Sequence, residues 1–156
     1  MNLDNVEEDM GALLKNQMVG YLCTADAKGV PHVTPMFFLY VFDKHELYFV
    51  TDRKSKKASN LLEVSNLAFT VDIRDRENPF NNRGVLLRGE LLKLTDLSFE
   101  LAEKSKTALK TFSEKYHGII AEEPMDEIIR RFHDVLVTAK IHQMTYWKGP
   151  FSRVFK

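Results

Sequence analysis

The chain has 156 residues, 44% of them hydrophobic, which fits one domain over residues 1–156 that buries its own core. Its 22 basic and 22 acidic residues balance to a formal net charge of zero, which argues against a general nucleic-acid or membrane-surface binder. Cys23 is the single cysteine, so an internal disulfide is excluded and the reducing cytoplasm is the expected compartment. No apolar run approaches the roughly 20 residues of a membrane-spanning helix.

The expected elements are mostly strands. An amphipathic helix begins near Asp4, a hairpin turn covers residues 26–29, and further helices begin at Ser55, near Asp96 and at Pro124, the last covering 125–132. Period-two patterns or short apolar runs predict strands over residues 19–25, 30–42, 46–51, 67–73, 85–94 and 135–147. Six strands in this order predict a mainly β fold with helices, in the form of a small closed barrel.

The helix that begins at Ser55 has an unusual charge order. A helix N-terminus carries roughly half a positive charge and four unpaired amide donors, so it favours acids nearby. The other predicted helices begin with acids, whereas this one is preceded by Arg53 and Lys54 and opens with Lys56 and Lys57. With Ser55 as a capping residue, the segment is either a phosphate-binding cradle or a solvated basic turn. Its position directly after a strand favours the cradle.

The second predicted strand is apolar on both faces around Pro35. Because proline cannot donate to a strand ladder, Pro35 indicates an edge strand, a bulge, or a place where the backbone faces a ligand. A flat aromatic ligand such as a flavin ring could take hydrogen bonds from this backbone and apolar contact from Met36.

These segments together carry a family resemblance. The order Gly29-x-Pro31-His-Val-Thr-Pro35, Tyr48-Phe-x-Thr51, Ser55-Lys-Lys57 and Asn60-Leu61 resembles the pyridoxamine 5'-phosphate oxidase-like, FMN-binding split-barrel family. The resemblance implies a six-stranded antiparallel split β-barrel and a homodimer with flavin at the subunit interface. It implies that the FMN phosphate is held by Thr51, Ser55, Lys56 and Lys57, and that Trp147 touches flavin across the interface. The candidate cofactor-binding residues are Thr34, Pro35, Met36, Val50, Thr51, Ser55, Lys56, Lys57 and Trp147.

The sequence also departs from the true oxidase. In the true oxidase the closing Arg is followed by a His-Asp-Arg run, whereas Arg153 is followed here by Val154, Phe155 and Lys156. The oxidase also carries an Arg and a Lys in its second strand, and the aligned positions here are Thr34 and Leu39. His133 belongs to a string that copies part of the missing run, and we interpret it as a helix-end residue. The expected function is therefore an FMN-dependent oxidoreductase with an unidentified small-molecule substrate, in which NAD(P)H could act as a transient reductant.

Two alternatives remain open at this stage. One is a deazaflavin-dependent reductase of the same fold, and the other is a non-enzymatic flavin- or haem-binding protein. The five histidines lack metal-ligand spacing and a second cysteine is missing, so no metal site is expected and no catalytic residue is assigned.

Overall fold

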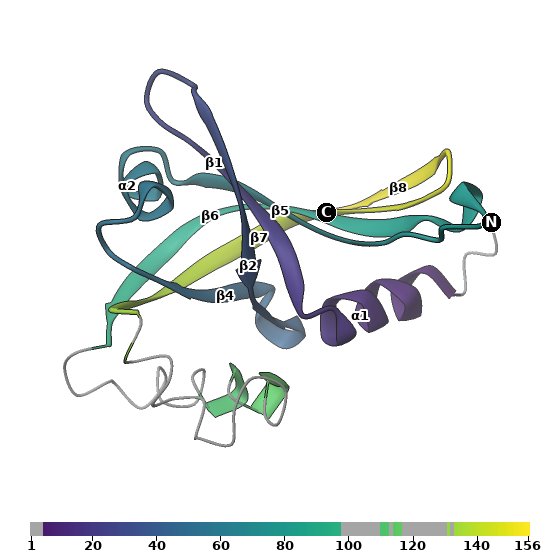
Figure 1. The fold of residues 1–156 in the computed structure, drawn as a ribbon, viewed down its shortest axis with the longest axis horizontal. Helices are drawn as coiled ribbons and strands as arrows, with labels where there is room; N and C mark the ends of the chain where they lie inside the picture. The colour runs from purple at the N-terminus through teal and green to yellow at the C-terminus, as the bar shows by residue number, and fades with distance from the viewer. Residues whose placement is uncertain (1–4, 98–109, 113, 117–130, 132) are drawn as a thin grey trace.

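The computed structural model describes residues 5–97, 110–112, 114–116, 131 and 133–156 (Figure 1). The elements are α1 (Val6–Asn16), β1 (Val19–Ala25), β2 (Pro31–Phe37), β3 (Leu39–Val41), η2 (Phe42–Lys44), β4 (Glu46–Thr51), α2 (Lys56–Glu63), β5 (Asn66–Ile73), η3 (Pro79–Asn81), β6 (Arg83–Asp96), β7 (Val135–Lys148) and β8 (Phe151–Phe155). The prediction of a mainly β fold with helices is confirmed.

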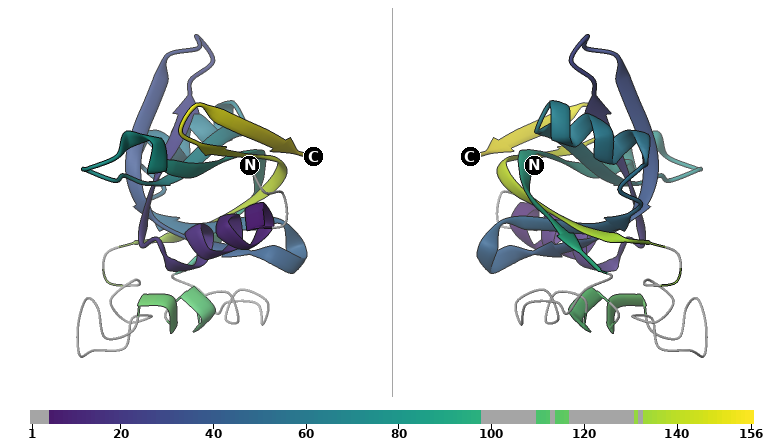
Figure 2. Two further views of the ribbon diagram at one scale, coloured as in Figure 1. Left: turned by 90° about the vertical axis from the view of Figure 1, so that its right-hand side faces the viewer. Right: turned by 90° about the vertical axis from the view of Figure 1, so that its left-hand side faces the viewer.

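The strands form one antiparallel sheet that curls on itself. Its order is β2-β1-β5-β6-β7-β4-β3, with β8 pairing β7. The two end strands, β2 and β3, are consecutive in the chain and are joined only through Phe38, so the covalent chain connects the two edges of the sheet. Figure 2 shows the resulting ring of strands from both ends. The architecture is a split barrel, as predicted.

Within the described residues the sheet has eight strands instead of the expected six. One extra strand arises because the predicted strand over residues 30–42 divides at Phe38 into β2 and β3. The Phe38 amide donates to the Tyr116 hydroxyl (2.8 Å), and the Phe38 carbonyl accepts from that hydroxyl (2.7 Å) and from the Lys115 ammonium (3.0 Å). These bonds satisfy the backbone at Phe38 without a ladder partner.

The other extra strand is β8, which forms a hairpin with β7 around Gly149 and Pro150. Strand β6 extends past the predicted end at residue 94 to Asp96, where it pairs with Val135, and the expected start of the following helix falls on residues outside the described part of the chain. Most of that helix and the predicted helix over 125–132 lie outside the described residues, although residues 110–112 and 114–116 are helical.

The core divides into two groups of buried side chains. The larger fills the barrel under α1 and includes Leu13, Leu14, Phe38, Phe69 and Leu87. The smaller joins Leu39, Tyr48, Val50, Leu97 and Leu136 to Phe112 and Tyr116 of the helical segment. Burial of these side chains from water stabilises the barrel by about 1.5–3 kcal/mol for each large aliphatic or aromatic residue.

One glycine permits the closest approach of two strands. A Cβ at Gly89 would lie 2.0 Å from the Lys140 carbonyl oxygen, and the β6–β7 register shifts between Arg88 and Gly89. Such irregularities bend long strands, and this bend helps the sheet to curl into a barrel.

Candidate cofactor pocket

A pocket of about 390 Å³ opens where the barrel is split, between β2 and β4. It brings together five of the predicted cofactor-binding residues: Pro35, Met36, Val50, Thr51 and Lys57. Its remaining lining residues are Val19, Phe37, Asp52 and His133. Its volume falls within the range of small-molecule sites, about 300–1,000 Å³.

The junction of β4 and α2 has the predicted capping geometry. Ser55 has an extended backbone, and its Oγ accepts a hydrogen bond from the Ala58 amide at 3.3 Å. The Thr51 and Ser55 hydroxyl oxygens lie 3.2 Å apart. The first turn of α2 contains no acidic residue. Two hydroxyls and the amide end of a helix therefore meet beside the pocket.

The cations around this junction have different environments. Lys57 lines the pocket, whereas the Lys56 ammonium lies 3.7 Å from the Asp26 carboxylate in the β1–β2 turn. Arg53 lies 3.5 Å from Asp96. The Lys54 ammonium is exposed and has no hydrogen-bond or ion-pair partner within the described part of the chain. Of the four cations, only Lys57 faces the pocket.

Pro35 fits two of the readings that the sequence left open. It lies in β2, an edge strand that pairs only with β1 among the described strands, and its ring also lines the pocket. Met36 lies on the opposite side of the strand and packs against the barrel core. Thr34 pairs with Leu22 and does not line the pocket.

Trp147 lies far from this pocket within one chain. The β4 end of the pocket pairs with the start of β7, where Val50 faces Leu136, whereas Trp147 is near the other end of β7 and packs against Gly84. At a rise of about 3.3 Å per residue, the strand separates Leu136 from Trp147 by up to about 36 Å.

Two pocket residues were missed by the sequence reasoning, Asp52 and His133. The His133 Nδ1 is buried, lies 3.8 Å from the Asp52 carboxylate, and has no hydrogen-bond partner among the residues that the structure describes. The adjacent Arg53 amide donates to the Asp134 carboxylate at 2.6 Å. These contacts follow from the pairing of Val135, at the start of β7, with Thr51, at the end of β4. The pairing brings the two residues before Val135 to the β4–α2 junction, and the predicted strand start at residue 135 was the sequence feature that could have indicated it.

The residues that the structure describes contain no group of three or more His, Cys, Asp or Glu side chains arranged to hold a metal ion. They also contain no helix with the length and hydropathy needed to cross a bilayer.

Comparisons with known proteins agree with this architecture. Residues 6–148 match the family described as Pyridoxamine 5'-phosphate oxidase. No curated protein sequence gives a significant match.

Three solved structures illustrate the range of proteins that share the fold. An F420 reductase is 22% identical, with a TM-score of 0.59 over 85% of this chain and 93% of its own. A conserved hypothetical protein from Mycobacterium tuberculosis is 24% identical, with a TM-score of 0.70 over 92% and 84%. The haem storage protein HutZ from Vibrio cholerae is 12% identical, with a TM-score of 0.67 over 96% and 93%. At these identities the likeness concerns the fold alone.

Proposed function

Because the chain belongs to the pyridoxamine 5'-phosphate oxidase family, we propose that it is an FMN-binding oxidoreductase whose cofactor occupies the pocket between β2 and β4. The observation that carries this proposal is the acid-free, Ser55-capped start of α2, beside which Lys57 enters the pocket. The substrate is a small molecule, and the single cysteine fits a cytoplasmic protein.

The residues at this junction fit a phosphate group. Free amides at a helix N-terminus point toward an anion, and the helix dipole favours negative charge there. The Thr51 and Ser55 hydroxyls supply donors, and Lys57 supplies a charge-assisted one. Lys56 would join them by leaving Asp26, from which its ammonium is 3.7 Å away on an exposed surface where ion pairs are weak.

The opposite wall of the pocket fits a flat ring. Val19, Pro35, Met36 and Phe37 present apolar surface, and the outer edge of β2 presents backbone groups without a ladder partner among the described strands. Hydrogen bonds from an unpaired strand edge would orient the ring, and apolar contact would exclude water from one of its faces.

Bound flavin would supply the hydride or electron chemistry, with NAD(P)H as a reductant from solution. The chain's own residues would hold and orient the cofactor: Thr51, Ser55 and Lys57 at its anionic end, and Pro35 and Met36 at its ring. Asp52 would place a negative charge near the anionic end, and the His133 ring, 3.8 Å from that carboxylate, lines the pocket beside it.

The proposed assembly is a homodimer with flavin at the interface. Val19, Tyr21, Val33 and Phe37 lie on one face of the β1–β2 hairpin with exposures of 41%, 49%, 60% and 44%. Large exposed apolar surfaces of this kind are typical of interaction sites. Val19 and Phe37 also line the pocket, so a second copy on this face would cover the cofactor. The family resemblance implies that Trp147 of that copy would touch the flavin.

The visible spectrum of the purified protein tests this function. Flavin absorption, either as purified or after adding FMN and removing the excess, is the expected result. A protein that neither contains nor takes up FMN would contradict the proposal. Size-exclusion chromatography with light scattering should give a dimer, and Val33→Asp should shift it toward monomer.

Two other cofactors belong in the same experiment. The F420 reductase among the structural neighbours makes a deazaflavin cofactor a candidate. The anionic tail of a deazaflavin cofactor is longer than the phosphate arm of FMN, and it would engage Lys57 as well. The haem storage protein makes haem a candidate, for which His133 is the histidine in the pocket. Competitive titration of FMN, the deazaflavin and haem would rank the three. If all bind poorly except haem, the protein is a haem binder and the oxidoreductase proposal fails.

A further inference from the structure

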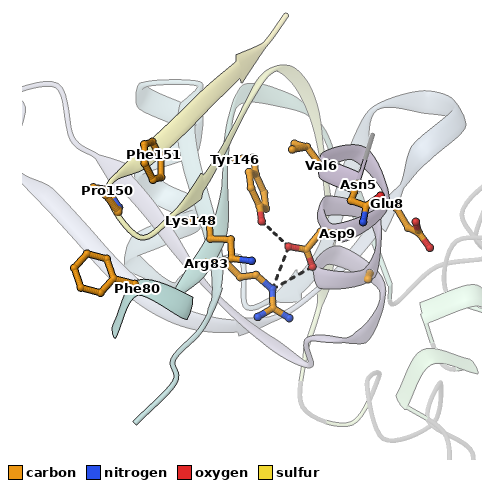
Figure 3. A pocket seen from close by; sticks show the side chains of 11 residues that line it. Asn5, Val6, Glu8, Asp9, Phe80, Arg83, Tyr146, Lys148, Pro150 and Phe151 are labelled. Atoms are coloured by element: carbon orange, nitrogen blue, oxygen red, sulfur yellow. Dashed lines mark hydrogen bonds and ion pairs between the residues drawn. The ribbon is translucent and has the colours of Figure 1, made fainter. Parts of the chain in front are cut away.

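A second and larger pocket, of about 790 Å³, lies between α1 and the β7–β8 hairpin (Figure 3). Phe80, Pro150 and Phe151 form one side, α1 forms the other, and Arg83, Tyr146 and Lys148 lie between them. This pocket therefore combines an aromatic wall with two cations, Arg83 and Lys148, and two carboxylates, Glu8 and Asp9. Apolar surface with a few placed polar groups is typical of small-molecule sites.

The polar centre of this pocket is a network around Asp9. The Arg83 Nε lies 3.1 Å from both Asp9 carboxylate oxygens, and the Tyr146 hydroxyl donates to one of them at 2.5 Å. Burial, followed by the bond to Asp9, raises the pKa of Tyr146 to about 12, so this hydroxyl remains a donor. Asp9 therefore neutralises Arg83 through Nε alone, and the terminal guanidinium nitrogens have no partner among the described residues.

Lys148 is the uncompensated cation of this pocket. It pairs directly with Arg83 across β6 and β7, so the two cations share one face of the sheet. Asp9 compensates the charge of Arg83, whereas it makes no bond to Lys148. Lys148 has no hydrogen-bond or ion-pair partner within the described chain, and the Glu8 side chain on α1 points away from it (Figure 3). An anion between Lys148 and the free end of Arg83 would supply the counter-charge that Lys148 lacks among the described residues, and would accept from the guanidinium nitrogens that Asp9 leaves unbonded.

The aromatic wall is held in place by the backbone. The Gly149 amide donates to the Asn82 carbonyl at 2.8 Å, which ties the β7–β8 turn to the loop before β6. Gly149 has a φ of +53°, and a Cβ there would lie 2.9 Å from the Phe80 carbonyl oxygen. Phe80 and Phe151 project from these two joined segments, with exposures of 69% and 64%. The wall is thus both preorganised and accessible.

This pocket is separate from the cofactor pocket. Lys148 and Leu136 lie near opposite ends of β7, up to about 40 Å apart along the strand. Arg83, Tyr146 and Lys148 also lie on the opposite face of the sheet from Gly84 and Trp147, because side chains alternate along paired strands.

We propose that this pocket binds an aromatic carboxylate, with the carboxylate between Lys148 and the terminal nitrogens of Arg83 and the ring against Phe80 and Phe151. The guanidinium fork matches a planar carboxylate, and the lysine adds a second charge-assisted bond. The proposal does not depend on the identity of the cofactor, because none of these residues lines the cofactor pocket.

The test uses benzoate and indole-3-acetate as probes, with neutral benzamide as the uncharged analogue, titrated into the full chain and followed by NMR chemical shifts. Both carboxylates should saturate, shift the amides of residues 146–151 and bind at least tenfold more tightly than benzamide. Lys148→Gln should weaken carboxylate binding about tenfold or more, and Phe151→Ala should weaken indole-3-acetate more than benzoate. Lys28→Gln, the same charge change in the exposed β1–β2 turn, should have no effect.

Three results would overturn the proposal: no saturable shifts, equal binding of benzamide and benzoate, or carboxylate binding unchanged in Lys148→Gln. A fourth would be an oligomer that Phe151→Asp converts to monomers, because the pocket would then be an interface between copies. The melting temperature of each variant shows whether it is folded, and Lys148→Gln should retain wild-type cofactor affinity.

Discussion

Replacement of Lys57 by alanine is the sharpest test of the cofactor pocket. The change removes the one ammonium among the four neighbouring cations that lines the pocket, and it leaves the Ser55 cap and the Thr51 hydroxyl in place. Alanine is also the best helix former, so α2 should retain its stability. The expected result is weaker FMN binding with an unchanged fold.

The magnitude follows from the exposure of the site. A hydrogen bond to a charged group contributes about 1.5–3 kcal/mol when it is well shielded from water. Lys57 is half-buried at the edge of an open pocket, so the lower end applies. At about 1.4 kcal/mol per factor of ten, Lys57→Ala should raise the Kd for FMN about tenfold. Riboflavin, which lacks the phosphate, should lose little affinity.

The matched control is Lys54→Ala, which removes an equal charge three residues before Lys57. The Lys54 side chain is exposed and does not line the pocket. Long-range electrostatics alone would change its FMN affinity only slightly at physiological salt. Titrations of FMN and riboflavin, followed by quenching of flavin fluorescence, measure all three proteins. Equal weakening in both variants, or equal losses for FMN and riboflavin in Lys57→Ala, would refute the assignment of Lys57 to the phosphate.

Four further predictions use the same purified protein. Ser55→Asp keeps a capping oxygen and should change the free energy of unfolding by less than about 1 kcal/mol, yet it should sharply weaken FMN binding by repelling the phosphate; unchanged affinity would place the phosphate elsewhere. Asp52→Asn removes the anion in the pocket wall and should strengthen FMN binding several-fold, whereas weaker binding would show that Asp52 is needed to position the site. Burial lowers the pKa of Lys115 to about 8 from 10.5, so between these values the unfolded chain binds more protons and the Lys115 contribution to stability should rise with pH; urea unfolding at pH 8 and 9.5 should show this rise in the wild type but not in Lys115→Met. Gly89→Ala places a methyl group 2.0 Å from the Lys140 carbonyl oxygen and should destabilise the barrel by several kcal/mol, in contrast to Gly11→Ala on α1, where the nearest atom is 4.0 Å away.

The start of α2 could be predicted because its signals are local. A capping serine, the absence of acids in the first turn and the strand directly before it lie within a few residues of one another. The structure also separates the cations, which the sequence could not do. Lys56 and Arg53 face Asp26 and Asp96, partners that are distant in sequence.

The features that the sequence did not reveal depend on distant contacts. The break at Phe38 requires the Tyr116 hydroxyl, 78 positions later, to bond its backbone. The entry of His133 into the pocket depends on the register of β7 against β4. The β8 strand forms because Gly149 adopts a positive φ and turns the chain back onto β7. The sequence around Gly149 and Pro150 was equally compatible with a sheet that ends at β7.

The connection through Phe38 has a consequence for access to the barrel. Since no described strand pairs with the outer edge of β2, the seam between β2 and β4 can part without breaking a single ladder hydrogen bond. Opening there would cost mainly side-chain contacts, so amides facing the seam should exchange with solvent well before those of β6 and β7, which are paired on both sides. The cofactor pocket lies along this seam, because its lining residues come from both β2 and β4.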